Sequence, residues 1–164
     1  MSKSFTLVEI IVAIFLITLG AGGAFVVVQT TTALTSVTSD QLTASYLVQE
    51  GIEVVRNIRD SNWLEQRSNP GLLWDDGISV GEDYRLDYLS TSFPDANCSL
   101  GADDYLKYDG NFYNCASGQD TKFKRKIIIT KPQANIIEVA VEVSWSERGR
   151  SHEVTAQTKL YNWK

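Results

Sequence analysis

The sequence predicts an α+β fold in which one long N-terminal α-helix packs on an antiparallel sheet of about four strands. An apolar run at residues 5–28 and a helical stripe of apolar residues at 44–58 predict the helix. Apolar residues that alternate with polar ones after residue 122 predict most of the strands. The chain has 164 residues, and those that follow the first run are enough for one compact domain.

The run at residues 5–28 has the length and composition of a membrane-spanning helix. No residue from 10 to 28 is charged, and a helix rises about 1.5 Å per residue, so this run can cross a bilayer core of about 30 Å. A secretory signal peptide ends its short apolar core at a cleavage site, whereas this run continues through Gly22 and Gly23 into valines. Lys3 precedes the run and favours a cytoplasmic N-terminus. We expect a single-pass cytoplasmic membrane protein whose head lies outside the cytoplasm.

Glu9 is the one carboxylate in this apolar run. A charged group at the centre of a membrane helix costs roughly 2.5–3.5 kcal/mol, so such a group usually has a partner or a task. Close to the helix N-terminus, however, a carboxylate is also favoured by the helix dipole and by contact with water and headgroups. A functional Glu9 and a merely interfacial Glu9 are both compatible with this position.

The residues after the first four are, in order, Phe5, Thr6, Leu7, Val8 and Glu9. This order resembles the N-terminus of the type IV pilin and pseudopilin family, and residues 46–64 are similar to the equivalent helix of its minor members. The resemblance implies a leader of residues 1–4, cleavage between Ser4 and Phe5, and N-methylation of Phe5. It also implies assembly through Phe5, Thr6 and Glu9, with Glu9 paired to the freed amine of Phe5 in a neighbouring subunit. Ser4 departs from the family, which usually has Gly there.

The same resemblance implies a function and a set of partners. We expect a structural subunit, a minor pilin or pseudopilin more than a major pilin, of a type IV pilus or type II secretion-like filament. Its partners would be copies of itself or other pilins, the prepilin peptidase and assembly machinery, and membrane lipid before assembly. After assembly it would lie in a cell-surface or periplasmic filament. The alternative is a non-polymerising, membrane-anchored surface domain that binds a ligand or an adhesion target.

Residues 29–60 are expected to continue the helix as an amphipathic segment, because they contain no proline. The apolar or small residues recur at helical spacing on one stripe: Ala44, Leu47, Val48, Gly51, Val54, Val55 and Ile58. Charged and amide residues fall opposite: Gln49, Glu50, Glu53, Arg56, Asn57 and Asp60. Threonines in residues 30–38 and the glycines at 20–23 mark places where the helix could bend. The small residues also suit close helix packing in membranes, and both interpretations stay open.

Residues 61–164 are expected to form a β-rich, pilin-like head. Turn residues at 69–71 and 75–77 predict an ordered loop between helix and sheet, with Trp63 and Trp74 as packing residues. Tyr84, Leu86 and Tyr88 alternate with polar residues, which predicts a first short strand.

Three longer strands are predicted near the C-terminus. Residues 123–131 form one, with Ile127 and Ile129 inward, and the other two fold back at Arg148-Gly149. The alternation of the two strands then sets their register. It pairs Val143 with Val154, Val141 with Ala156, Val139 with Thr158, and Ile137 with Leu160.

The two cysteines, Cys98 and Cys115, both follow the membrane run. A domain outside the cytoplasm lies in an oxidising compartment, where a cysteine pair most often forms a disulfide. Two free thiols or a metal site are the alternatives, and a metal site would need further ligands such as His nearby.

Other patterns point to functions that we consider weaker. The net charge of −5 argues against a general nucleic-acid binder, and the short basic run Lys122, Lys124, Arg125 and Lys126 fits a solvated edge strand better than a DNA site. We expect no cofactor, with calcium at Asp103, Asp104, Asp109 and Asn111 as the one alternative, although EF-hand spacing is lacking. Ser79 lies in a G-x-S-x-G pattern, and His152 follows. That pattern needs a parallel α/β sheet, so no enzyme is expected. Asn97 begins a glycosylation sequon.

Overall fold

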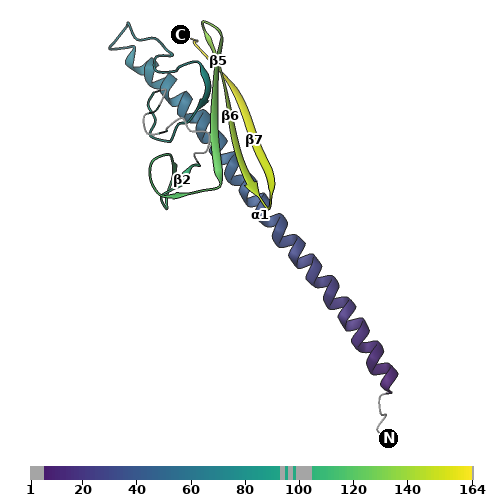
Figure 1. Cartoon of the computed structure of the whole chain (residues 1–164). Helices are drawn as coiled ribbons and strands as arrows, with labels where there is room; N and C mark the ends of the chain where they lie inside the picture. The colour runs from purple at the N-terminus through teal and green to yellow at the C-terminus, as the bar shows by residue number, and fades with distance from the viewer. Residues whose placement is uncertain (1–5, 93–94, 96–97, 99–104, 164) are drawn as a thin grey trace. The chain divides into compact units, whose positions relative to one another are not determined.

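The computed structural model describes residues 6–92, 95, 98 and 105–163 (Figure 1). The predictions on the leader, on Ser4 and Phe5, on Asp103 and Asp104, and on the sequon at Asn97 therefore lie outside the described residues. The chain divides into two compact units, one ending at Asp40 and the other beginning at Gln41.

One α-helix and an antiparallel sheet confirm the predicted α+β class. Helix α1 covers Leu7–Glu65, and the main sheet has the strand order β1-β5-β6-β7. Its strands are β1 (Gly81–Tyr84), β5 (Phe123–Gln133), β6 (Ile136–Glu147) and β7 (Arg150–Tyr161). Every strand pair in it is antiparallel.

The register of the last hairpin is the predicted one. Val143 pairs with Val154, Val141 with Ala156, Val139 with Thr158, and Ile137 with Leu160. The turn is made by Arg148 and Gly149, which both have positive φ, at 52° and 76°. Two consecutive positive φ angles match the right-handed twist of the flanking strands, which explains why the fold-back occurs there.

The core lies between the second part of α1 and the inner face of the main sheet. All seven residues of the predicted helical stripe are buried. They meet the inward side chains of β5 and β6, among them Ile127, Ile129, Val139, Val141 and Val143, each at most 1% exposed. Gly51 permits this close approach, because a Cβ there would lie 2.9 Å from Cγ1 of Val141.

The helix ends at Glu65, five residues beyond the predicted end. Trp63 therefore lies in the last turns of α1, not in the loop, and it is buried like Trp74. Side-chain amides of the final turns hold the loop that follows: Asn62 donates to the carbonyl oxygens of Trp74 and Asp76, and Gln66 donates to that of Leu72. These bonds order the loop against the end of the helix, and they account for the extension of the helix beyond its predicted end.

The first strand differs from the prediction. Strand β1 covers Gly81–Tyr84, and Leu86, expected inside the strand, is fully buried just after it. Strand β1 pairs with β5 through an irregular register. Of the residues whose alternation predicted the strand, Leu86 is buried but Tyr88 is exposed. Leu86 is followed by a turn in which Asp87 Oδ1 accepts the Leu89 backbone N–H at 2.9 Å.

A second, small sheet was not predicted. It has the order β3-β2-β4, with β2 at Lys107–Tyr108, β3 at Tyr113–Asn114 and β4 at Gln119–Asp120. The close turn near Gly118 needs glycine, since its φ is 109° and a Cβ would lie 2.3 Å from the Tyr108 carbonyl oxygen.

Candidate functional site

The first part of α1 exposes an apolar surface. Every residue from 6 to 35 whose side chain is described is exposed, and the large apolar ones between Leu7 and Leu34 are 49–76% exposed. This is the one helix in the described part of the chain that is long and apolar enough to cross a membrane, and its apolar window is not buried against other residues. An apolar surface of this extent marks a contact with lipid or with other protein.

Thr6 and Glu9 begin this helix as an N-terminal cap. The backbone N–H of Glu9 donates to Oγ1 of Thr6 at 3.3 Å, and the N–H of Ile10 donates to the Thr6 carbonyl oxygen at the same distance. Thr followed three residues later by Glu is the sequence pattern of a capping box, and the structure forms the half of it in which the Thr6 hydroxyl satisfies a backbone N–H of the helix start. The structure thus gives Thr6 a local role that the sequence analysis missed.

The carboxylate of Glu9 is exposed in the first turn of α1. Among the described residues it has no ion-pair or hydrogen-bond partner. Its position is favourable for a negative charge, because the open N–H groups of a helix N-terminus carry a partial positive charge. A cationic group brought to this end of the helix by another molecule would meet it directly.

The threonines that follow the apolar run turn their hydroxyls back onto the helix. Each donates to the carbonyl oxygen four residues earlier, at 2.9–3.0 Å: Thr30, Thr31, Thr32, Thr35 and Thr38. Their polar atoms are thus satisfied within the helix, and the segment needs no water for them. Such bonds also favour slight bending of the helix.

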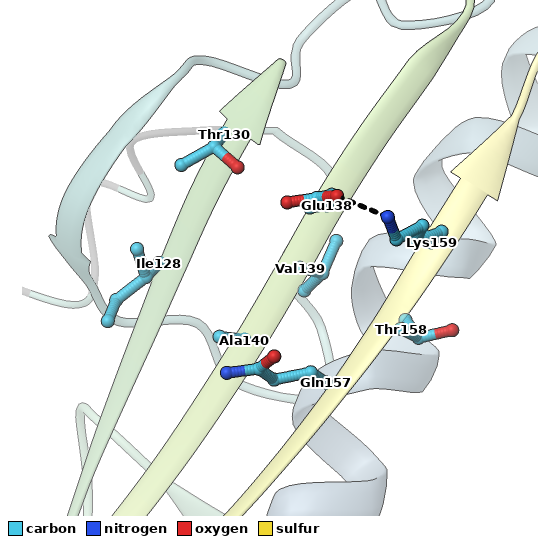
Figure 2. Close-up of a pocket in the computed structure, with 8 residues that line it drawn as sticks. All are labelled: Ile128, Thr130, Glu138, Val139, Ala140, Gln157, Thr158 and Lys159. Carbon is cyan, nitrogen blue, oxygen red and sulfur yellow. Dashed lines mark ion pairs between the residues drawn. The ribbon is translucent and has the colours of Figure 1, made fainter. Parts of the chain in front are cut away.

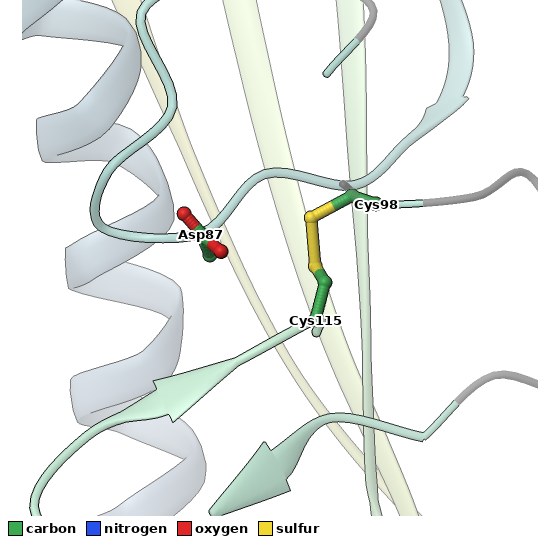
Figure 3. A group of neighbouring side chains, drawn as sticks. All are labelled: Asp87, Cys98 and Cys115. Atoms are coloured by element: carbon green, nitrogen blue, oxygen red, sulfur yellow. A yellow bond between two sulfur atoms is a disulfide. The ribbon is translucent and has the colours of Figure 1, made fainter. Parts of the chain in front are cut away.

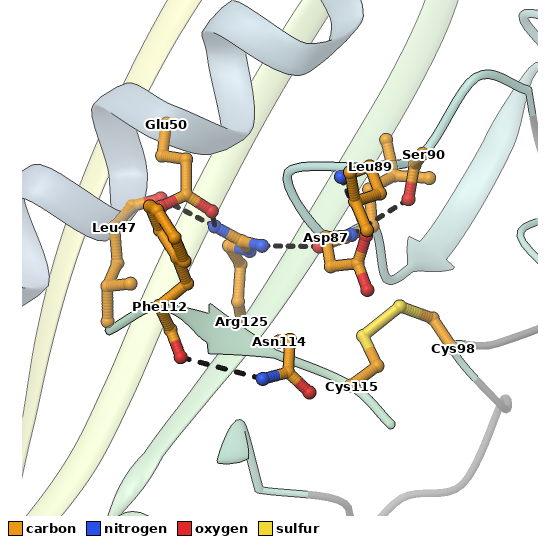
Figure 4. A network of polar contacts seen from close by, with 11 residues as sticks. Leu47, Glu50, Asp87, Leu89, Ser90, Cys98, Phe112, Asn114, Cys115 and Arg125 are labelled. Atoms are coloured by element: carbon orange, nitrogen blue, oxygen red, sulfur yellow. Dashed lines mark hydrogen bonds and ion pairs between the residues drawn. A yellow bond between two sulfur atoms is a disulfide. The ribbon is translucent and has the colours of Figure 1, made fainter. Parts of the chain in front are cut away.

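Arg125 is the main polar contact between α1 and the sheet. Its Nη1 donates to Oε1 of Glu50 at 2.8 Å and to the Leu47 carbonyl oxygen at 3.2 Å. Its Nη2 donates to the Leu86 carbonyl oxygen. Figure 4 shows the guanidinium between the helix and the turn that carries Asp87. Arg125 is 2% exposed, so it ties three segments together inside the core.

This position corrects the prediction for the basic run. Strand β5 lies between β1 and β6, so it is not an edge strand, and Arg125 points inward. Its neighbours are also engaged: Lys122 lies 3.7 Å from Glu147, and Lys124 lies 4.5 Å from the ring of Tyr105. The strand alternation leaves Lys122, Lys124 and Lys126 half-buried on one side and turns Arg125 alone to the other, so the four cations do not form one solvated face.

Cys98 and Cys115 form the predicted disulfide, with Cα atoms 5.1 Å apart. Asp87 lies beside them, and one of its oxygens and the two sulfurs are within 4.8 Å of one another (Figure 3). A metal would need thiolates at this place, and the two sulfurs are instead bonded to each other. The disulfide joins the segment after β1 to the small sheet.

Asp109 stabilises the loop between β2 and β3. Its Oδ1 accepts the backbone N–H groups of Asn111 and Phe112, both at 2.8 Å. These bonds, that from Phe112 first, lower the pKa of the Asp109 carboxyl. Of the four residues considered for calcium, Asp109 and Asn111 are described, and the geometry uses them as an Asx-type turn.

Strands β5, β6 and β7 line a shallow hollow on the main sheet (Figure 2). Thr130, Glu138 and Lys159 form one cross-strand row in it, and Nζ of Lys159 lies 2.7 Å from Oε1 of Glu138. The next row consists of Ile128, Ala140 and Gln157. The Glu138 carboxylate raises the pKa of Lys159.

The residues of the G-x-S-x-G pattern are not arranged as in a nucleophile elbow. Ser79 precedes strand β1, and in the described residues no helix follows that strand. His152 lies opposite Trp145 across the hairpin, and the two rings stack with centroids 5.3 Å apart. The elbow needs a strand before the serine and a helix after it.

Comparisons with protein-family models, with curated proteins and with solved structures found no match for this chain.

Proposed function

We propose that this chain is a structural subunit of a membrane-stored filament of the type IV pilin and pseudopilin kind. The observation that carries the proposal is the first part of α1. Its described side chains from residue 6 to residue 35 are exposed, and in sequence it is uncharged from residue 10 to residue 39. A single carboxylate, Glu9, stands at its start, where the order of residues resembles the family.

The packing of the head supports different roles for the two parts of α1. The buried residues from Ala44 to Trp63 are already covered by the sheet and its loops, whereas the described side chains of residues 6–35 have no such cover. An apolar surface that the chain does not bury itself is available for lipid and then for the same helix in other subunits. In that assembly Glu9 would meet the freed amine of Phe5 from a neighbour.

Intact mass of the protein from its own cells tests the processing step. A chain that begins with N-methylated Phe5 supports the proposal. A chain that keeps residues 1–4 contradicts it and supports the alternative, a permanently anchored surface domain that does not polymerise.

A Glu9→Ala variant tests the assembly step. We expect it to remain in the membrane fraction but to be absent from sheared filaments, because the neighbouring amine loses its counter-charge. Glu53→Ala is the matched control, since Glu53 is an exposed carboxylate further along the same helix, and it should assemble normally. Normal incorporation of Glu9→Ala would contradict the assigned role of Glu9.

A further inference from the structure

Strand β7 forms one edge of the main sheet (Figure 1). It has twelve residues, Arg150–Tyr161, and all of them pair with β6 without a register shift. In the described part of the chain no strand pairs with its other edge. An antiparallel strand bonded on one side leaves half of its N–H and C=O groups directed away from its partner.

Three features that commonly prevent pairing at an edge, a short strand, a bulge and proline, are missing from β7, although it does carry the charged residues Arg150, Glu153 and Lys159. Natural edges are commonly short, bulged or interrupted by proline. The opposite edge, β1, follows this rule, because it has four residues and an irregular register. Strand β7 is long and regular and contains neither proline nor glycine. It also carries His152, Val154, Ala156 and Thr158 only half-buried on its inner side.

We propose that β7 is a pairing surface for β7 of a second copy of this chain, antiparallel and centred on Ala156. Antiparallel pairing of a strand with its own copy is two-fold symmetric, so one register fixes every contact. With Ala156 opposite Ala156, Ser151 lies opposite Tyr161, and nearly the whole strand is used. The half-buried pairs Val154 with Thr158 then extend the inner face across both copies.

Charge complementarity selects this register. It places Glu153 opposite Lys159 of the second copy, and the symmetry repeats the pair. Moving the centre to Thr155 or Gln157 leaves both charges opposite uncharged residues. Moving it further, to Glu153 or Lys159, puts like charges face to face, which is destabilising. Only the Ala156 register combines opposite charges with full overlap.

The outer face adds a longer charge pattern. Lys159 already contacts Glu138 on β6, at 2.7 Å. In the paired sheet the row would run Glu138, Lys159, then Glu153 of the second copy, so that a cation lies between two carboxylates. The exposed fractions of the Lys159 and Glu138 side chains, 57% and 41%, leave both able to accept a new neighbour.

This contact goes beyond the proposed filament and does not depend on it. Subunits of a polar helical filament are related by rotation and translation along one axis, so their contacts are head-to-tail. A two-fold β7 pair therefore joins chains from separate filaments, or chains that are not in a filament.

Cysteine cross-linking of the full-length chain in detergent tests the register. An Ala156→Cys variant places the new residue opposite itself, with Cβ atoms about 4.5–5.5 Å apart in the paired strands. We expect it to form a covalent dimer on mild oxidation. Thr158→Cys is the matched control on the same face and should remain monomeric on a non-reducing gel, because its own copy would lie four residues away. Equal dimer from both variants, or none from Ala156→Cys, overturns the proposal.

Charge exchange tests the specificity without new cysteines. Glu153→Lys alone and Lys159→Glu alone each place like charges opposite each other, and both should lose the dimer in sedimentation or native mass measurements. A mixture of the two single variants restores both opposite-charge pairs, so a mixed dimer should form. Unchanged melting of each variant shows that the head still folds. A dimer that persists in the single variants, or a mixture that stays monomeric, overturns the assigned contact. The Glu9→Ala test of filament assembly is independent of these measurements, so the two proposals can fail separately.

Discussion

Nη1 of Arg125 on β5 lies 2.8 Å from Oε1 of Glu50 on α1, and this ion pair connects the sheet to the helix. The Arg125 side chain is 1% exposed, while that of Glu50 is 33% exposed. The same guanidinium also donates to the carbonyl oxygens of Leu47 and Leu86. A cation this deeply buried depends on its acceptors, because removing the counter-charge leaves an uncompensated charge in the core.

Replacing Glu50 by alanine should therefore destabilise the head strongly. We expect Glu50→Ala to lower the free energy of unfolding by about 3 kcal/mol, since breaking one side of a buried pair typically costs this much. Glu50→Gln keeps an oxygen acceptor and should cost less. Urea unfolding of the chain in detergent measures both. The control is Glu53→Ala, whose exposed pair with Arg56 should contribute at most about 1 kcal/mol. Equal losses at Glu50 and Glu53 would contradict this role for Arg125.

Gly51 should not tolerate a side chain, although it lies inside a helix. An added Cβ would meet Cγ1 of the buried Val141 at 2.9 Å and Cδ of Arg125 at 3.4 Å. Overpacking costs about 1–3 kcal/mol, more than the roughly 1 kcal/mol that alanine gains in helix propensity. Gly51→Ala should thus lower the melting temperature. Gly20→Ala, which meets nothing within 4 Å, should leave the melting of the head unchanged. A rise in melting temperature for Gly51→Ala would show that Val141 can move aside.

The turn between β6 and β7 can be improved. Arg148 has a φ of 52°, a conformation that costs ordinary residues roughly 1–2 kcal/mol. Asparagine adopts it more readily, and Asn-Gly is the preferred pair for this type of turn. We expect Arg148→Asn to raise the free energy of unfolding by about 0.5–1 kcal/mol. Arg150→Asn, just after the turn, is the control and should not stabilise the protein. Thermal unfolding of the two variants side by side distinguishes them.

The disulfide should contribute a large part of the stability of the loop region. Cys98 and Cys115 are 17 residues apart, and closing a loop of this size is worth about 3 kcal/mol in the chain-entropy model. The double variant Cys98→Ser with Cys115→Ser should unfold at lower denaturant concentration than the oxidised protein. It should also resemble the reduced wild-type chain. A double variant as stable as the oxidised protein would show that the surrounding contacts suffice.

The hydrogen bonds that Asp109 accepts should make the loop between β2 and β3 depend on pH. Hydrogen bonds from the N–H groups of Phe112 and Asn111 lower its pKa below the ordinary value of 3.8. A lowered pKa means that these bonds stabilise the loop above the ordinary pKa and are lost as the pH falls through the folded pKa. The amide NMR shifts of Asn111 and Phe112 should therefore change with a midpoint below 3.8. In Asp109→Asn the amide oxygen still accepts but does not titrate, so the change should disappear. A midpoint above 3.8 would contradict the assignment.

The regular parts of this fold could be predicted because their patterns are long. Twelve paired positions fix the register of β6 and β7, and one slip would turn Val141 and Val143 outward. The helical stripe from Ala44 to Ile58 was predicted for the same reason, since several turns repeat it.

The small sheet could not be predicted, because two-residue strands carry no periodicity. The pairing of these strands is set by turns such as that at Gly118 and by the disulfide, which act between segments far apart in the sequence. The first strand was predicted, but a few residues too late in the sequence. Arg125 was placed wrongly because a cation is normally exposed. Its alternation with Phe123 and Ile127 was a signal that it points inward. The local cap made by Thr6 was also visible, as Thr followed by Glu at the third position.

The internal bonds of the threonines bear on how deeply the helix would sit in a bilayer. Residues 10–39 contain no charge, and as a helix they extend about 45 Å, roughly 15 Å more than a hydrocarbon core. Thr30, Thr31 and Thr32 keep their hydroxyls satisfied at any depth, so it is the exposed amide of Gln29 that resists burial in hydrocarbon between Glu9 and Asp40. The helix can therefore shift along its axis by about 15 Å before Glu9 or Asp40 enters the hydrocarbon core. In the proposed function, a subunit drawn out of the membrane would move no charged side chain into lipid over this first distance.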